Sequence, residues 1–146
     1  MATFRLAKRD DVSQLRSLDT VSAAMDQIGG KKCFVLRRKG ILEYFLKCKG
    51  ILVAEDEGRI VGYVLAHPVE WIHGISKLVW IEHIGVHPDH RRRGIGLGML
   101  KFVRRHYRTT ARCLHAEIHP LNQRSVRMFR KFGVELVERK LAFKKL

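Results

Sequence analysis

The sequence predicts an α+β fold, or α/β by a looser definition, in which a mixed sheet carries helices against its faces. Two β-rich runs, residues 51–55 and 60–66, flank a polar turn that contains a glycine, which predicts an antiparallel hairpin. Two strand–loop–helix units follow, and such helical crossovers join parallel neighbouring strands. The length of 146 residues suits one compact domain over residues 1–146 better than two.

The segments before the hairpin are expected to form one strand and two helices. Residues 3–7 alternate in polarity and predict a short strand. Residues 10–25 begin with two aspartates and then repeat apolar side chains at helical spacing. A glycine pair at 29–30 ends this helix, and apolar residues at helical spacing from about 35 to 49 predict a second helix.

The segments after the hairpin predict alternating strands and helices. Strands are expected at residues 77–87 and 113–119, and helices at residues 97–107 and 122–132. Residues 134–143 predict one or two final strands.

The composition is that of a globular protein, with 46% hydrophobic residues. No apolar run approaches the roughly 20 residues that span a bilayer, and the first residues lack the apolar core of a secretion signal. We therefore expect a soluble, cytoplasmic protein without a membrane partner. The cysteines, Cys33, Cys48 and Cys113, are odd in number and widely spaced, so free thiols are expected instead of a zinc site or disulfides.

The net charge of +15 is the extreme feature of the composition, with 29 Lys and Arg against 14 Asp and Glu. It indicates an acidic or polyanionic partner. Contacts to a phosphorylated cofactor, attraction to nucleic acid or a ribosome-like particle, and solubility alone are all compatible with it.

A basic, glycine-rich loop between a predicted strand and helix is the most informative stretch. Arginines at 91–93 precede glycines at 94, 96 and 98. Glycines let backbone amides approach a phosphate, the helix adds unpaired amides, and arginines add charge-assisted hydrogen bonds. The loop is therefore predicted to bind an anion. Its spacing fits neither the P-loop of NTPases nor the dinucleotide fingerprint of dehydrogenases.

The loop spacing R-x-x-G-x-G, at Arg91, Gly94 and Gly96, resembles motif A of the GNAT N-acetyltransferases. The stretch Glu117-Ile118-His119-Pro120-Leu121-Asn122, followed by Ser125, Phe129 and Gly133, resembles the second signature of that family. In motif it is most similar to the branch that acetylates ribosomal-protein N-termini. The resemblance covers most of the chain from Ile51 onward.

The resemblance implies a mostly antiparallel sheet with helices on both faces, and acetyl-CoA as cosubstrate. It implies that a primary amine attacks the thioester directly, through a tetrahedral intermediate, with no enzyme nucleophile. A splay between the strands that end at Val86 and His119 is expected to open the site. The implied cofactor-binding residues are Ile84, Gly85, Val86, Arg91, Arg92, Arg93, Gly94, Ile95, Gly96, Leu97 and Asn122.

Two carboxylates are candidates for the base that deprotonates the amine. Glu117 is the first, because the resemblance places a proton-accepting Glu there. Glu82 is the second, because it lies in an apolar strand with the same parity as Ile84 and Val86, where an unpaired charge is costly. An ion pair with an arginine is the alternative for each.

Phe129 departs from the family pattern. The family often has a Tyr there, whose hydroxyl protonates the departing thiolate, and Phe cannot donate a proton. Water, His119 or Tyr107 could replace it, the thiolate could leave unassisted, or the chain could be an inactive binder. Histidines such as His83 and His87 have no carboxylate or cysteine at ligand spacing, so no metal is expected.

The acceptor is expected to be a primary amine, with a protein N-terminus or Lys side chain favoured. In the family it is selected by the first two helices and the last hairpin, here residues 10–49 and 134–143, which carry no readable motif. The rival hypothesis is a non-catalytic CoA-binding or nucleic-acid- or ribosome-binding module that uses the basic stretch at 104–112. A nucleic-acid-binding module would be supported by aromatic stacking platforms or by a recognition helix, and the sequence shows neither.

Overall fold

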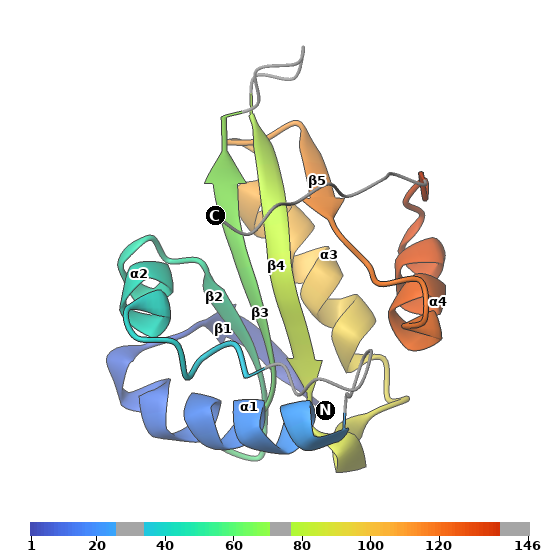
Figure 1. The fold of residues 1–146 in the computed structure, drawn as a ribbon. Helices are drawn as coiled ribbons and strands as arrows, with labels where there is room; N and C mark the ends of the chain where they lie inside the picture. Colours follow the sequence, from blue (N-terminus) through green and yellow to red (C-terminus); the bar gives the residue numbers. More distant parts are fainter. Residues whose placement is uncertain (26–33, 71–76, 138–146) are drawn as a thin grey trace, which may run out of the picture.

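A computed structural model describes residues 1–25, 34–70 and 77–137. In these ranges five strands form one sheet in the order β1-β2-β3-β4-β5. Neighbouring strands are antiparallel from β1 to β4, and β5 is parallel to β4. This mixed, mostly antiparallel sheet confirms the predicted class (Figure 1). The strands are β1 (Thr3–Leu6), β2 (Ile51–Asp56), β3 (Arg59–Val69), β4 (Leu78–Val86) and β5 (Cys113–Ala116).

Helices cover both faces of the sheet, as Figure 1 shows. Successive strand residues point to opposite faces, so Ile51 and Val53 of β2 pack with α1 and α2, whereas Leu52 and Ala54 pack with α3 and α4. Each face therefore has its own apolar core. The helices are α1 (Val12–Met25), α2 (Ile41–Lys47), α3 (Ile95–Tyr107) and α4 (Gln123–Phe132), with short 3₁₀ turns η1 (Arg9–Asp11) and η2 (Pro88–His90).

Three predicted elements differ from the structure. The second helix spans only Ile41–Lys47 because it begins after Gly40, whose φ of +82° is left-handed. The predicted strand 113–119 ends at Ala116, where its pairing with β4 also ends. Residues 134–137 are in neither a helix nor a strand, and the remaining residues predicted as final strands lie outside the described part.

An irregularity in β4 decides which face one candidate residue occupies. Leu65 pairs with His83, and the next residue, Ala66, pairs with Ile81, so Glu82 is an additional residue on β4. A β-bulge of this kind re-aims side chains. Ile84 packs with the core under α3, whereas Glu82 bonds His67, whose ring contacts Phe45 of α2. The prediction that Glu82 shares the side of Ile84 and Val86 is therefore wrong.

Buried Asp19 fixes α1 against the sheet. It accepts the hydroxyl hydrogen of Tyr63 at 2.7 Å and the amide of Leu36 at 3.1 Å. The ring of Tyr63 in turn lies against Gly85, where a Cβ would come within 2.8 Å of it. Asp19 is therefore satisfied inside the fold, and the glycine at 85 makes room for Tyr63.

Candidate functional site

A cavity of about 720 Å³ opens where β4 and β5 separate. The two strands pair from Leu78 with Cys113 to Ile81 with Ala116, where β5 ends. Beyond that pair, the rest of β4 and the segment that follows β5 form the cavity wall. The expected splay between these strands is present. The loop before α3 and the inner side of α4 complete the wall.

The cavity reaches both faces of the sheet. Ile84 and Val86 of its wall belong to the face that packs with α3, whereas His83 stacks on Tyr63, which packs with α1. Ser22 of α1 also lines it. A long ligand could therefore enter beside α3 and α4 and present its end on the α1 and α2 side.

The loop before α3 has the backbone of an anion cradle. Arg92 and Gly94 have left-handed φ values of +62° and +78°, and nothing lies within 4 Å of the position that a Cβ on Gly94 would take. The Arg91 side chain is held by a hydrogen bond from its Nε to the carbonyl of Val86 at 3.0 Å. The first amides of α3 have no acceptor inside the helix, so they can bind an anion.

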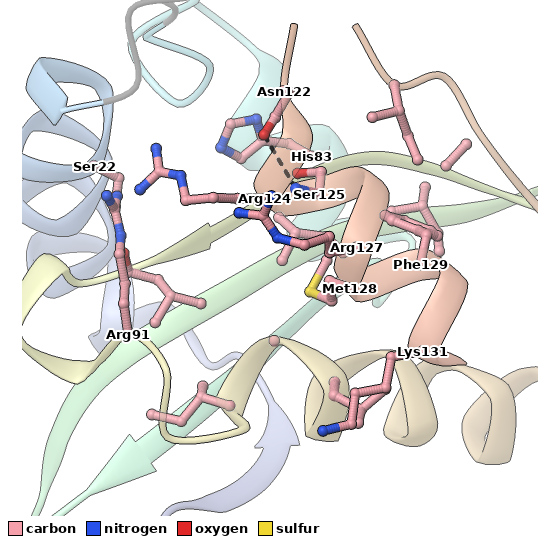
Figure 2. Close-up of a pocket in the computed structure, with 18 of the residues that line it drawn as sticks. Ser22, His83, Arg91, Asn122, Arg124, Ser125, Arg127, Met128, Phe129 and Lys131 are labelled. Atoms are coloured by element: carbon pink, nitrogen blue, oxygen red, sulfur yellow. Dashed lines mark hydrogen bonds between the residues drawn. The ribbon is translucent and has the colours of Figure 1, made fainter. Parts of the chain in front are cut away.

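Five cationic side chains line the cavity. Arg91 and Arg92 come from the loop, and Arg124, Arg127 and Lys131 come from α4. In Figure 2, Arg124 and Arg127 extend from α4 toward the side where Arg91 and Ser22 lie. The three α4 residues were not among those predicted from the sequence. The signal was present, because residues 123–132 contain four Arg or Lys and no Asp or Glu.

One buried polar atom of the wall, Ser22 Oγ, has no hydrogen-bond partner among the described residues. His90 Nδ1 of the same wall makes no hydrogen bond there either, but it lies 3.8 Å from Asp56 Oδ2. An unpaired buried polar atom costs free energy unless a ligand or water satisfies it. Together with the cations, the Ser22 hydroxyl fits a long ligand that carries both phosphates and other polar groups, such as CoA.

Most of the residues predicted for the site line this one cavity. Arg93 is exposed and does not line it, and Gly85 is buried beside Tyr63. The predicted residues that do line it are Glu82, Ile84, Val86, Arg91, Arg92, Gly94, Ile95, Gly96, Leu97, Glu117 and Asn122.

Asn122 caps the N-terminus of α4. Its side-chain oxygen accepts the amide of Ser125 at 3.1 Å, as the dashed line in Figure 2 shows. This is a structural role that N-cap asparagines commonly have. The side-chain NH₂ of Asn122 is still available to a ligand.

The two candidate carboxylates differ in their surroundings. Glu82 Oε1 lies 3.1 Å from His67 Nε2, and the Glu82 side chain is 45% exposed. Glu117 is exposed, and its side chain makes no ion pair or hydrogen bond with another residue that the structure describes. Neither carboxylate is paired with an arginine of residues 1–25, 34–70 or 77–137.

The two side chains predicted as possible proton donors for the thiolate, Tyr107 and His119, differ in whether they line the cavity. Tyr107 donates its hydroxyl hydrogen to the carbonyl of Ala66 at 3.1 Å, and burial raises the pKa of Tyr107 to about 12. Tyr107 does not line the cavity, so that hypothesis is wrong. His119 lines it, and its Nδ1 accepts the amide of Leu121 at 3.2 Å, which places the proton of a neutral ring on Nε2. Phe129 lines the wall as a buried apolar residue.

Within residues 1–25, 34–70 and 77–137, no three His, Cys, Asp or Glu side chains gather to hold a metal ion. Cys48 and Cys113 are free thiols that do not line the cavity, and Cys33 lies outside the described residues. No described helix is both long and apolar enough to cross a membrane.

Comparisons with known proteins agree with this geometry. A sequence profile of the Acetyltransferase (GNAT) family matches residues 23–134, which is most of the chain. No curated protein matches the sequence.

Several solved structures with the same fold are described as acetyltransferases. The aminoglycoside N-acetyltransferase AAC(6')-Iy in complex with CoA has a TM-score of 0.80 and 21% identity over 99% of this chain and 95% of that chain. The aminoglycoside acetyltransferase meta-AAC0020, from an uncultured soil metagenomic sample, has a TM-score of 0.77 and 16% identity over 99% and 95%. A possible acetyltransferase from Clostridium difficile 630 has a TM-score of 0.78 and 14% identity over 100% and 98%.

At these identities the solved structures establish the fold, and the family profile establishes the family. The chain belongs to the GNAT acetyltransferase family and is an N-acetyltransferase with acetyl-CoA as its donor.

Proposed function

We propose that this chain, as one domain over residues 1–146, acetylates a primary amine of a protein or peptide, either the N-terminal amine or a Lys side chain. The observation that carries the proposal is the cavity between β4 and β5, to which α4 and the loop before α3 contribute cations and the bulge of β4 contributes a held carboxylate. This arrangement separates a place for a phosphorylated donor from a place for an amine.

The donor side is assigned to the loop and to α4. The amides at the start of α3, in the cradle formed at Arg92 and Gly94, would bond the pyrophosphate. Arg127 and Lys131 would form ion pairs with the 3′-phosphate of the donor. Ile84 and Val86 would align the pantetheine arm along β4. When bound, acetyl-CoA supplies the activated acyl group.

On the acceptor side we assign the proton-accepting role to Glu82, with Glu117 as the second candidate. Glu82 lies in the bulge at the point where the strands separate, and the bulge turns it away from the α3 core. A carboxylate there can take the proton of an ammonium group, which leaves a neutral amine able to attack. His119, with its proton on Nε2, is the candidate that protonates the departing thiolate.

The charge of the cavity supports a singly charged acceptor. Among the described residues, its wall has five Arg or Lys, at 91, 92, 124, 127 and 131, and two carboxylates, Glu82 and Glu117. The whole chain has a net charge of +15. A polycationic aminoglycoside would be repelled by this field, whereas a peptide with one ammonium group and acidic side chains would be attracted.

The test is thiol release from acetyl-CoA with a panel of acceptors. The panel contains peptides with acidic or basic residues after the N-terminal amine, matched peptides with that amine blocked and a Lys inserted, and aminoglycosides. We expect the highest kcat/KM with acidic peptides that have a reactive amine. Turnover confined to aminoglycosides would refute the acceptor class, and CoA binding without turnover on any amine would refute catalysis.

A second candidate function, binding of nucleic acid or a ribosomal surface, is favoured by a separate basic group at the end of α3. Arg104, Arg108 and Arg112 line a small hollow outside the main cavity. Binding of a phosphate backbone there would weaken steeply with salt, and it would survive saturation of the main cavity with CoA. An RNA that binds only when CoA is absent would instead be occupying the donor site.

A further inference from the structure

A hydrogen-bonded row of three side chains leads from the cavity to the surface beside α2. Glu82 Oε1 lies 3.1 Å from His67 Nε2, and His67 Nδ1 lies 3.4 Å from the Tyr44 hydroxyl oxygen. The three residues come from β4, β3 and α2. Only Glu82 lines the cavity. Neither His67 nor Tyr44 has a role in the function proposed so far.

The His67 ring is held in one orientation by its neighbours. Tyr44 and Phe45 contact it edge to face, with centroid distances of 6.0 and 5.4 Å and interplanar angles of 83° and 88°. The His67 side chain is 19% exposed, whereas that of Glu82 is 45% exposed. A well-fixed imidazole thus supports a carboxylate that solvent alone would leave free to rotate.

The row also defines the tautomer of His67. Tyr44 can donate its hydroxyl hydrogen to Nδ1, which leaves the proton of the neutral ring on Nε2, where it is donated to Glu82 Oε1. One carboxylate oxygen is then occupied, and Oε2 is the oxygen left to accept a proton. Tyr44 and Glu82 are the titratable groups that bond this ring among the described residues.

We propose that His67 is a positioning residue that orients the Glu82 carboxylate toward the acceptor amine. It touches neither donor nor acceptor. An ammonium proton moves to Glu82 Oε2, the nitrogen keeps its electron pair for attack, and the proton is passed from Glu82 to water. A single hydrogen bond of this kind controls how often the carboxylate is in the productive orientation. The inference rests on the role proposed above for Glu82.

Two substitutions separate the hydrogen bond from packing. His67→Phe keeps an aromatic ring against Tyr44 and Phe45 but removes the donor to Glu82. His67→Gln loses the ring but can place an amide N–H near the position of Nε2. His106→Phe is the control, because His106 is an exposed histidine of α3 that does not line the cavity.

The experiment measures kcat, the KM for acetyl-CoA and the acceptor, CoA affinity and the melting temperature in seven proteins. These are wild type, His67→Phe, His67→Gln, Glu82→Gln, the double variants His67→Phe/Glu82→Gln and His67→Gln/Glu82→Gln, and the control His106→Phe. We expect His67→Phe to lower kcat about tenfold with unchanged CoA affinity. His67→Gln should recover part of that loss, and His106→Phe should match wild type. In the Glu82→Gln background, His67→Phe should have no further effect.

The outcomes separate this inference from the proposed function. A normal kcat for His67→Phe, or the same fold-loss with and without Glu82→Gln, overturns the positioning role while Glu82 keeps its own. A normal kcat for Glu82→Gln overturns the proposed base and the inference together. If His67→Phe is unfolded by its melting temperature, the comparison is made with His67→Gln, which must then be non-additive with Glu82→Gln.

Discussion

The two sides of the cavity are built in different ways. Helix α4 and the loop before α3 contribute backbone amides, a left-handed glycine and five cations to the wall, and these features depend on local sequence. On the α2 side, the carboxylate of Glu82 is placed by a bulge and held by His67 across the sheet. The donor side is therefore formed by a local sequence motif, whereas the acceptor side depends on how β3 and β4 are paired. Substitutions on the donor side should change the affinity for CoA, and substitutions on the acceptor side should change kcat.

The largest effect is expected from Glu82→Gln, which removes the proposed base at nearly constant shape. General bases contribute typically 10²–10⁴-fold, so kcat should fall by roughly 10² or more while CoA affinity is unchanged. Steady-state kinetics with a peptide acceptor and calorimetric CoA titration measure both. Glu70→Gln, at an exposed position outside the cavity, is the control. If Glu117→Gln gives the large loss instead, the base is Glu117.

On the donor side, Gly94→Glu combines backbone strain with a misplaced negative charge. A non-glycine residue at φ near +78° costs about 2 kcal/mol, and the free loop can relieve this strain by leaving the cradle conformation. CoA binding must then restore that conformation, so CoA should bind roughly 30-fold more weakly. Gly40→Glu is the matched control, because Gly40 also has a positive φ and open space at its Cβ position but lies outside the cavity. Equal CoA affinity for both variants would mean that the loop is not the cradle.

The two sides of the cavity also differ in how well they could be predicted from the sequence. The class of the sheet, the order of the elements and the loop at Arg91 to Gly96 were predictable, because each depends on residues near one another in the chain. The face of Glu82 was not, since a bulge is visible only when Leu65 and Ala66 are paired with β4. Nor was the contact with His67, which lies 15 positions away.

A smaller effect is expected from Arg127→Ala. Loss of one exposed charge-assisted contact should weaken CoA about fivefold, and the difference should shrink as salt is added. Arg130→Ala, on the same helix but outside the cavity wall, should leave CoA affinity unchanged. Titration of both variants with CoA and with 3′-dephospho-CoA locates the contact. If the two variants weaken CoA equally, net charge is the cause and no specific contact exists.

The smallest effect on activity is expected from Asp11→Asn, far from the cavity. The Arg5 hydrogen bond lowers the pKa of Asp11, and the amide of Lys8 acts in the same direction while burial opposes it. A lowered pKa in the folded state contributes stability above the unfolded value near 4, and this contribution is lost as pH falls through the folded value. Urea unfolding should show about 1–3 kcal/mol of destabilisation at pH 7, and less at pH 3.

Glu82→Gln, in contrast, should leave the free energy of unfolding nearly unchanged, because Glu82 is half exposed and pairs with no arginine that the structure describes. A stability loss as large as that of Asp11→Asn would give Glu82 a structural role and weaken its assignment as the base.

The most direct measurement is a crystal structure with a bisubstrate analogue in which CoA is joined to the N-terminal amine of an acidic peptide. The two-sided cavity predicts the pyrophosphate at the Gly94 loop, the pantetheine arm along Ile84 and Val86, and the peptide nitrogen within hydrogen-bond distance of Glu82 Oε2. A peptide nitrogen on the α3 and α4 side of the sheet, or an analogue bound outside the cavity, would contradict it.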